Sequence, residues 1–187
     1  FFVHEFDNGV TLLAEKMPEV ACAAVSMMIP SGSAIDPVGL EGSANVLLEM
    51  LQKGAGPWGS RAHSEQFEEL GVRRSYSAGV EVTVFSASMV ADRLAKALEI
   101  ISVLLLQPHF PAEELESVRS LVLQDIDALE DEPASKIMNE LAKKFYPYPF
   151  GRSQLGTKEG VEAIDIVKVK AHYEKVFRSQ RLVIGVS

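Results

Sequence analysis

Strand-type runs at both ends of the chain enclose a middle with helical periodicity, and this order constrains the fold more than any other feature. Short β-type runs cover 1–6, 10–15 and 21–29, and another covers 181–186. The first two runs are joined by Asp7-Asn8-Gly9, and an Asn-Gly pair supplies the positive φ angles that a tight hairpin needs. The chain is therefore predicted to be an α+β unit, with a mixed, mostly antiparallel sheet of about five or six strands and helices packed on it.

The middle of the chain is predicted to hold further strands and several helices. Apolar spacing, together with glycine and proline breaks, places these elements at 40–53, 60–70, 72–77, 80–89, 91–106, 111–130, 134–145 and 166–176. We interpret Gly54 to Pro57 as a helix stop and Ser60 as the cap of the second helix. No linker divides the chain, so residues 1–187 are interpreted as one domain.

Charge and cysteine content narrow the function classes. Asp and Glu number 26 against 18 Lys and Arg, a formal charge of −8, so nucleic-acid binding is not expected. The single cysteine, Cys22, is predicted to be a small buried hydrophobic residue. The longest apolar run, 100–106, is too short to span a bilayer, and no charged leader with a cleavage site opens the chain. We therefore expect a soluble chain without membrane insertion, and the compartment stays open.

The helix predicted at 111–130 carries a carboxylate where an apolar residue is expected. Its apolar residues at three-and-four spacing form a stripe, and Asp125 is assigned to the same face. An ionised carboxylate on an apolar face is costly unless it is hydrogen-bonded, paired or bound to a metal. Two interpretations stay open from the residues alone: a carboxylate at the edge of the stripe satisfied by a neighbouring donor, or a former or present ligand position.

Four segments, in order along the chain, resemble one family of peptidases. They are FDNGVTLLAEKMPEVACAAVSMMIPSGS, PHFPAEELESVRSLVLQDIDALEDEP, FGRSQLGTKEGVEAI and VKAHYEKVFRSQRLVIGVS. Together they resemble the M16 zinc metallopeptidases, the family of pitrilysin, insulinase and the mitochondrial processing peptidase, and the likeness extends over the whole chain. The resemblance implies an N-terminal-type domain of that family, so this chain is expected to be one half of a longer two-domain protein.

The active site of that family is an inverted zinc motif, H-x-x-E-H, on the first long helix, with a distal Glu on a later helix. The two histidines bind Zn²⁺ from one helical face, and the glutamate beside them polarises the attacking water. The segment GSANVLLEMLQKGA matches this helix, which places Asn45 and Glu49 at the histidine positions and Leu48 at the general-base position. Counting forward without a gap places Asp125 at the distal position.

These replacements predict that Asn45, Leu48, Glu49 and Asp125 are vestigial, and that the chain has no catalytic residue, metal or other cofactor of its own. A neutral amide is a poor zinc ligand, and leucine has no proton acceptor. We expect the two facing carboxylates to take up a proton or recruit a donor, with a bound Mg²⁺ or Ca²⁺ as the open alternative. The 4 histidines form no pair at metal-ligand spacing, and His63 is interpreted as part of a solvated helix face.

In active relatives an extended peptide adds as a strand to the edge strand after the second helix, and the resemblance assigns that role to Arg74, Ser75, Tyr76 and Ser77. Main-chain pairing at an edge does not need the zinc. The predicted function is a non-catalytic M16 subunit or domain that assists peptide binding or assembly, with a zinc-bearing M16 partner joined in cis or in trans. Two alternatives stay open: a divergent active zinc metalloendopeptidase, and a structural subunit resembling the core proteins of respiratory complexes.

Overall fold

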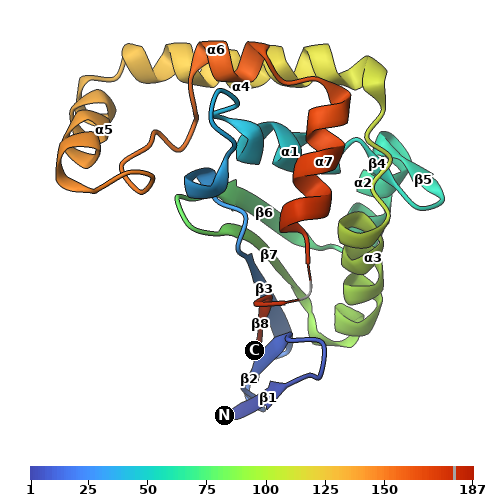
Figure 1. The fold of residues 1–187 in the computed structure, drawn as a ribbon. Coiled ribbons are helices and arrows are strands. Elements are labelled where there is room, and N and C mark those ends of the chain that lie inside the picture. Colours follow the sequence, from blue (N-terminus) through green and yellow to red (C-terminus); the bar gives the residue numbers. More distant parts are fainter. Residues whose placement is uncertain (179) are drawn as a thin grey trace.

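The strands from the two ends of the chain meet in one sheet. The computed structural model describes residues 1–178 and 180–187, and within them the strand order is β1-β2-β8-β3-β7-β6 (Figure 1). Neighbouring strands are antiparallel except β2 and β8, which are parallel. The predicted mixed, mostly antiparallel sheet is therefore confirmed, with six strands in the described chain. The strands are β1 (Phe2–Glu5), β2 (Thr11–Ala14), β3 (Cys22–Ile29), β6 (Arg73–Ala78), β7 (Thr83–Val90) and β8 (Val183–Val186).

Burial alternates along the central strands, so one face of the sheet is covered. In β3, Val25 and Met27 are buried and Met28 is exposed, which is the period of two that a strand with one covered face requires. Val25 and Met27 share one core cluster with buried residues of β7 and with Ile100 and Leu104 of α3. This cluster joins the sheet to its helical layer.

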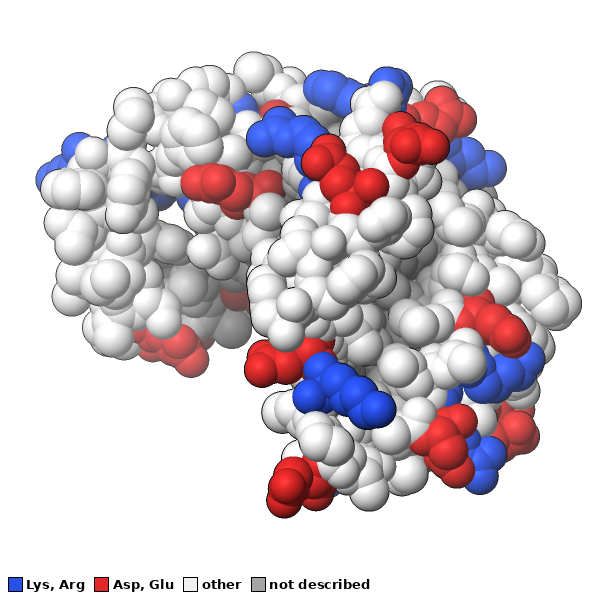
Figure 2. Space-filling view, turned by 90° about the horizontal axis from the view of Figure 1, so that it is seen from below, with Lys and Arg blue, Asp and Glu red and all other residues white. Residues whose placement is uncertain are grey.

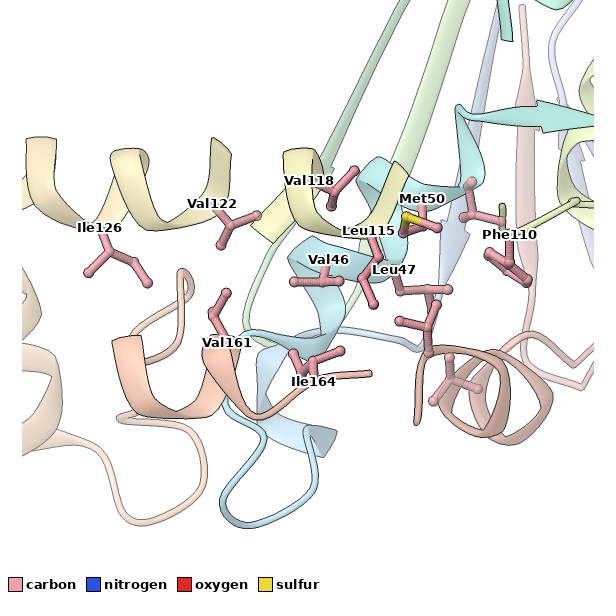
Figure 3. Packing of buried hydrophobic residues seen from close by; sticks show 13 residues of the cluster. Val46, Leu47, Met50, Phe110, Leu115, Val118, Val122, Ile126, Val161 and Ile164 are labelled. Atoms are coloured by element: carbon pink, nitrogen blue, oxygen red, sulfur yellow. The ribbon is translucent and has the colours of Figure 1, made fainter. Parts of the chain in front are cut away.

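A second core cluster joins the helices. These are α1 (Ser43–Leu51), α2 (Ser60–Glu69), α3 (Leu94–Leu106), α4 (Leu115–Glu130), α5 (Pro133–Phe145), α6 (Lys158–Glu162) and α7 (Ile166–Val176), with 3₁₀ turns at Ser33–Ile35, Ala91–Arg93 and Ala112–Glu114. Figure 3 shows Val46 and Met50 of α1 near Val118 of α4. Val161 of α6 belongs to the same cluster. The helices that carry Asn45 and Asp125 thus pack side by side, as predicted.

Some local predictions need correction. The segment interpreted as a helix stop after α1 belongs to a small antiparallel hairpin, β4 (Gly54–Ala55) and β5 (Trp58–Gly59). Ser60 is not the cap, because Gly59 takes that position and Ser60 is the first residue of α2, with its hydroxyl donating to the Gln52 carbonyl oxygen at 3.4 Å. The short helix α6 was not predicted; its cap is Thr157, whose hydroxyl oxygen accepts from the Gly160 N–H at 3.0 Å.

Two residues have a different exposure from the one predicted. Cys22 is exposed, because it begins β3 on the side opposite the buried Ala23. His63 is buried rather than solvated, because its face of α2 turns inward. Its ring lies 5.1 Å from the Phe67 ring and 6.1 Å from the Trp58 ring, measured between centroids.

The outline of the molecule separates α5 from the rest. Figure 1 shows α5 at the C-terminal end of α4, away from the sheet, and both chain ends at the end of the sheet farthest from α4. No α5 residue is buried, although the helix carries several large apolar side chains.

On the face drawn in Figure 2, charged side chains of both signs are interspersed. Within the described residues, no helix is both long enough and apolar enough to cross a membrane.

Candidate functional site: the first long helix and a sheet edge

The start of α1 is held by a carboxylate from upstream in the chain. Gly42 precedes the helix with a φ of +111°, a left-handed conformation that favours glycine. The Asp36 carboxylate accepts hydrogen bonds from the backbone N–H of Gly42 at 2.8 Å and of Ala44 at 2.9 Å. Burial raises the pKa of Asp36 to about 6, although the two backbone donors and Arg152 oppose the rise. This anchoring fixes the position of the helix residues that follow.

The side chain of Asn45 is engaged with a distant segment. Its Nδ2 atom donates a hydrogen bond to the Gln154 carbonyl oxygen at 2.5 Å, 109 residues further along the chain. The same segment packs tightly on the residues before α1 at Gly156, where an added Cβ would lie 2.3 Å from the Glu41 carbonyl oxygen. Asn45 therefore links α1 to the segment between α5 and α6.

At the general-base position, Leu48 is a core residue. Its exposed fraction is 8%, and it packs with Ala44 and Ala78, next to the partly buried Tyr76. An aliphatic side chain has no proton acceptor, and its apolar surroundings would disfavour a charged group. The structure therefore provides no group at this position that activates a water molecule.

Glu49 and Asp125 interact electrostatically across the contact between α1 and α4. Burial raises the pKa of the half-buried Glu49, and the Asp125 charge raises it further, while Lys53 and a hydrogen bond from Gln52 oppose the rise. Burial also raises the pKa of Tyr76 in β6, and the Glu49 charge adds to that effect. The repulsion between the two carboxylates thus adds to the effect of burial, which is the main cause of the raised pKa of Glu49.

Asp125 does not lie on the buried face of α4, contrary to the interpretation of the sequence. Its side chain is exposed, whereas Val122 and Ile126 are buried. Asp125 lies beside the apolar stripe of α4. The exposure of a residue at that position depends on which neighbouring element packs against the helix there. Figure 3 shows α4 extending past α1 on the side of Ile126.

The donors at these positions do not fit a zinc ion. Zinc in peptidases is held by three protein ligands, usually histidine with a carboxylate, plus a water. Here the Asn45 amide is bound to a backbone carbonyl, Leu48 has no donor atom, and two carboxylates remain. In the described part of the chain, no group of three or more His, Cys, Asp and Glu side chains is placed to hold a metal. Zinc-dependent hydrolysis therefore does not follow from this helix.

β6 forms one edge of the sheet and contains the residues assigned to peptide binding. It pairs with β7, and its other edge has no strand partner among the described residues. Arg74 points toward the helices, with its guanidinium 4.5 Å from the centre of the Phe67 ring, and Tyr76 stacks on a phenylalanine of β7. Ser75 and Ser77 are exposed. The edge thus combines anchored large side chains with small exposed ones.

A buried pair next to α1 was missed by the sequence analysis. His172 of α7 lies with its Nε2 atom 3.7 Å from Oδ1 of Asp36. Burial lowers the pKa of His172 to about 4, so a neutral imidazole lies beside the carboxyl group rather than an ion pair. The one available signal was the spacing of Val169, His172 and Val176, which places the imidazole on the buried face of α7.

Comparison with known proteins gives one consistent family. An uncharacterized zinc protease of Rickettsia bellii is 28% identical over 166 residues, which cover 88% of this chain and 40% of the relative. The mitochondrial-processing peptidase subunit beta of Saccharomyces cerevisiae is 24% identical over 181 residues, which cover 95% of this chain and 39% of the relative. The chain therefore spans less than half the length of these curated relatives.

A solved structure and a family model agree with this likeness. The peptidase M16 inactive domain from Pseudomonas fluorescens has a TM-score of 0.87 at 22% identity, over 99% of this chain and 45% of that chain. The model of the insulinase family, peptidase family M16, matches residues 11–158. Since this match covers most of the sequence, the chain belongs to the insulinase family of peptidases, M16.

Proposed function

We propose that this chain is a non-catalytic M16 domain that holds an extended peptide along β6 while a zinc-bearing M16 partner cleaves it. The observation that carries the proposal is the set of contacts made by α1: Asn45 makes a structural link and Leu48 is part of the core, within a fold that matches a solved M16 domain. The similarity to a solved M16 domain named as inactive supports this conclusion. In this proposal the chain itself carries out no chemical step.

Peptide binding would use the backbone of β6. An unpaired edge presents N–H and C=O groups that an added strand satisfies, and this pairing needs no metal. The small exposed side chains of Ser75 and Ser77 leave room beside the backbone. Arg74 and Tyr76 anchor the strand on the helical side. The edge is therefore held in place before a peptide arrives.

The chemistry would come from a second M16-like unit, in cis or in trans. The relatives extend well beyond the region matched here, which leaves room for a second unit in a longer protein. The yeast relative is named as a subunit, which supports the arrangement in trans. In either case the partner supplies the zinc and the general base that α1 lacks.

Backbone recognition is tested with N-methylated peptides. Along a paired strand, successive N–H groups point alternately toward and away from the neighbouring strand. A fluorescein-labelled peptide of about ten residues is prepared unmodified, or N-methylated at odd or at even positions. In fluorescence anisotropy, one methylated series is expected to lose binding while the other retains it. Equal effects of both series would contradict strand addition.

Assistance to a partner is tested by co-expression. The chain is produced with an M16 protein of the same organism that has an intact H-x-x-E-H motif, and complex formation is measured by pull-down. Peptide cleavage by that partner is then compared with and without this chain. Faster cleavage or altered peptide choice is expected. Equal cleavage without a stable complex would leave only a structural role.

A further inference from the structure

A recess opens at the end of β6. It lies between the end of α4, the start of α5 and residues 153–155, and its volume is about 400 Å³. Leu129, Met138 and Leu155 supply its large apolar side chains, and no charged side chain of the described chain lines it. The polar residues of the lining are uncharged: Ser135, Asn139, Ser153 and Gln154. In Figure 2 a hollow separates the lobe where α5 lies from the body of the molecule.

The recess continues the sheet edge. Ala78 is the last residue of β6, and it also lines the recess. A peptide strand advances roughly 3.3 Å per residue, and its side chains alternate between the two faces. A peptide paired along β6 therefore passes the mouth of the recess where the edge ends, with a side chain directed to one side or the other at each step.

One wall of the recess is held by α1. Gln154 and Leu155 line the recess, and the Asn45 amide holds the carbonyl oxygen of Gln154. The adjoining Gly156 packs against the backbone before α1 with a φ of +87°, so this end of the segment is also fixed. The side chain at the first vestigial ligand position thus positions a wall of the recess.

We infer that this recess is a side-chain subsite for one uncharged apolar residue of a peptide paired with β6, an inference that rests on the proposed function. Asn45 is its positioning residue. A charged side chain loses water on entering the recess and meets no partner of opposite sign among the described lining residues, so acidic and basic side chains are disfavoured. A leucine-sized or methionine-sized side chain gains from burial against Leu129, Met138 and Leu155.

The subsite is tested with a guest-residue series in peptides of about ten residues. Each peptide consists of serine and threonine residues with one central Leu, Gln, Glu or Lys. Because such a uniform peptide can pair with β6 in several registers, the central residue can reach the recess. In fluorescence anisotropy with the full chain, the Leu peptide is expected to bind about tenfold more tightly than the Gln peptide. The Glu and Lys peptides are expected to bind no more tightly than the Gln peptide.

Matched variants locate the effect. Met138→Asp places a charge in the recess, and it is expected to abolish the Leu preference without changing the affinity for the Gln peptide. Ile137→Asp is the control, because it makes the same kind of change on the same helix at a residue outside the recess lining, with exposed fractions of 65% for Ile137 and 63% for Met138. If both variants lost the preference for the Leu peptide, the assignment of the subsite to this recess would be wrong.

The role of Asn45 has its own readout. Asn45→Asp removes the donor to Gln154 and is expected to reduce the Leu preference severalfold, whereas Asn45→Gln keeps an amide and restores part of it. Circular dichroism confirms that each variant is folded. Equal affinity for all four guests, with the alternating N-methylation effect intact, would overturn the subsite and leave strand addition standing. Absence of peptide binding altogether would overturn both.

Discussion

Replacing His172 with phenylalanine is expected to change how the stability of this protein depends on pH. His172 is 4% exposed, and neither ring nitrogen has a hydrogen-bond partner among the described residues. Among the described residues, the carboxyl group of Asp36, 3.7 Å away, is the one group placed to compensate an imidazolium charge for the loss of water. The imidazole is therefore held neutral, and acid must either charge it in place or unfold the chain.

As the pH falls, the titrations of His172 and Asp36 change the free energy of unfolding in opposite directions. Burial lowers the pKa of His172 from 6.5 to about 4, so its stabilising contribution is present above 6.5 and is lost as the pH falls toward 4. Burial raises the pKa of Asp36 from 3.8 to about 6, so its contribution is present below 3.8 and is lost as the pH rises through 6. Between these limits the two effects partly cancel.

The magnitude follows from these pKa values. Between about pH 7 and pH 5, the titration of His172 lowers the free energy of unfolding by about 2 kcal/mol, and that of Asp36 raises it by about 1 kcal/mol. Loss of the imidazole removes the first effect and leaves the second. The variant should therefore gain about 2 kcal/mol relative to the wild type on going from about pH 7 to pH 5.

The assay is urea unfolding of both proteins at each pH, followed by circular dichroism. Comparing the two pH differences cancels the other titrating groups and any constant packing cost of the larger ring. The exposed His4, replaced by phenylalanine, controls for the loss of one histidine. A variant that instead loses stability on acidification relative to the wild type would show that His172 and Asp36 form a true ion pair, and would refute the reasoning.

Further predictions concern the metal, the helix cap and the core. The wild-type chain is expected to retain no zinc through dialysis and to cleave no peptide. Asn45→His with Glu49→His should bind about one zinc per chain by elemental analysis, because two imidazoles then share a helical face and the Asp125 carboxylate, which interacts with position 49, supplies the third ligand. Asp36→Ala should cost about 1 to 2 kcal/mol in urea unfolding at neutral pH, because two backbone donors lose their acceptor. Leu47→Ala in the core should cost about 2 to 5 kcal/mol, and Leu141→Ala on exposed α5 about 0.5 kcal/mol or less. Equal losses at the two leucines would show that α5 is covered in solution.

Much of the fold was predictable because helical and strand periods are local properties. The period of two in β3 and the three-and-four spacing in α4 each state which face is buried, without reference to any partner. Elements of only a few residues are too short to show a hydrophobic period, so the hairpin β4–β5 and the helix α6 were not predicted. Exposure at the first residue of a strand or on the flank of a stripe was also mispredicted, at Cys22 and Asp125.

By itself the sequence determined the family resemblance and the mixed sheet with its helices, because residue identity and spacing decide those points. The loss of the zinc motif at Asn45, Leu48 and Glu49 stays a prediction from the same residues. Tertiary structure decided what the replaced residues do. The contact from Asn45 to Gln154 joins residues 109 apart, and the burial of His172 beside Asp36 joins two separate elements. Local patterns specify a face, but only packing selects which distant group meets it.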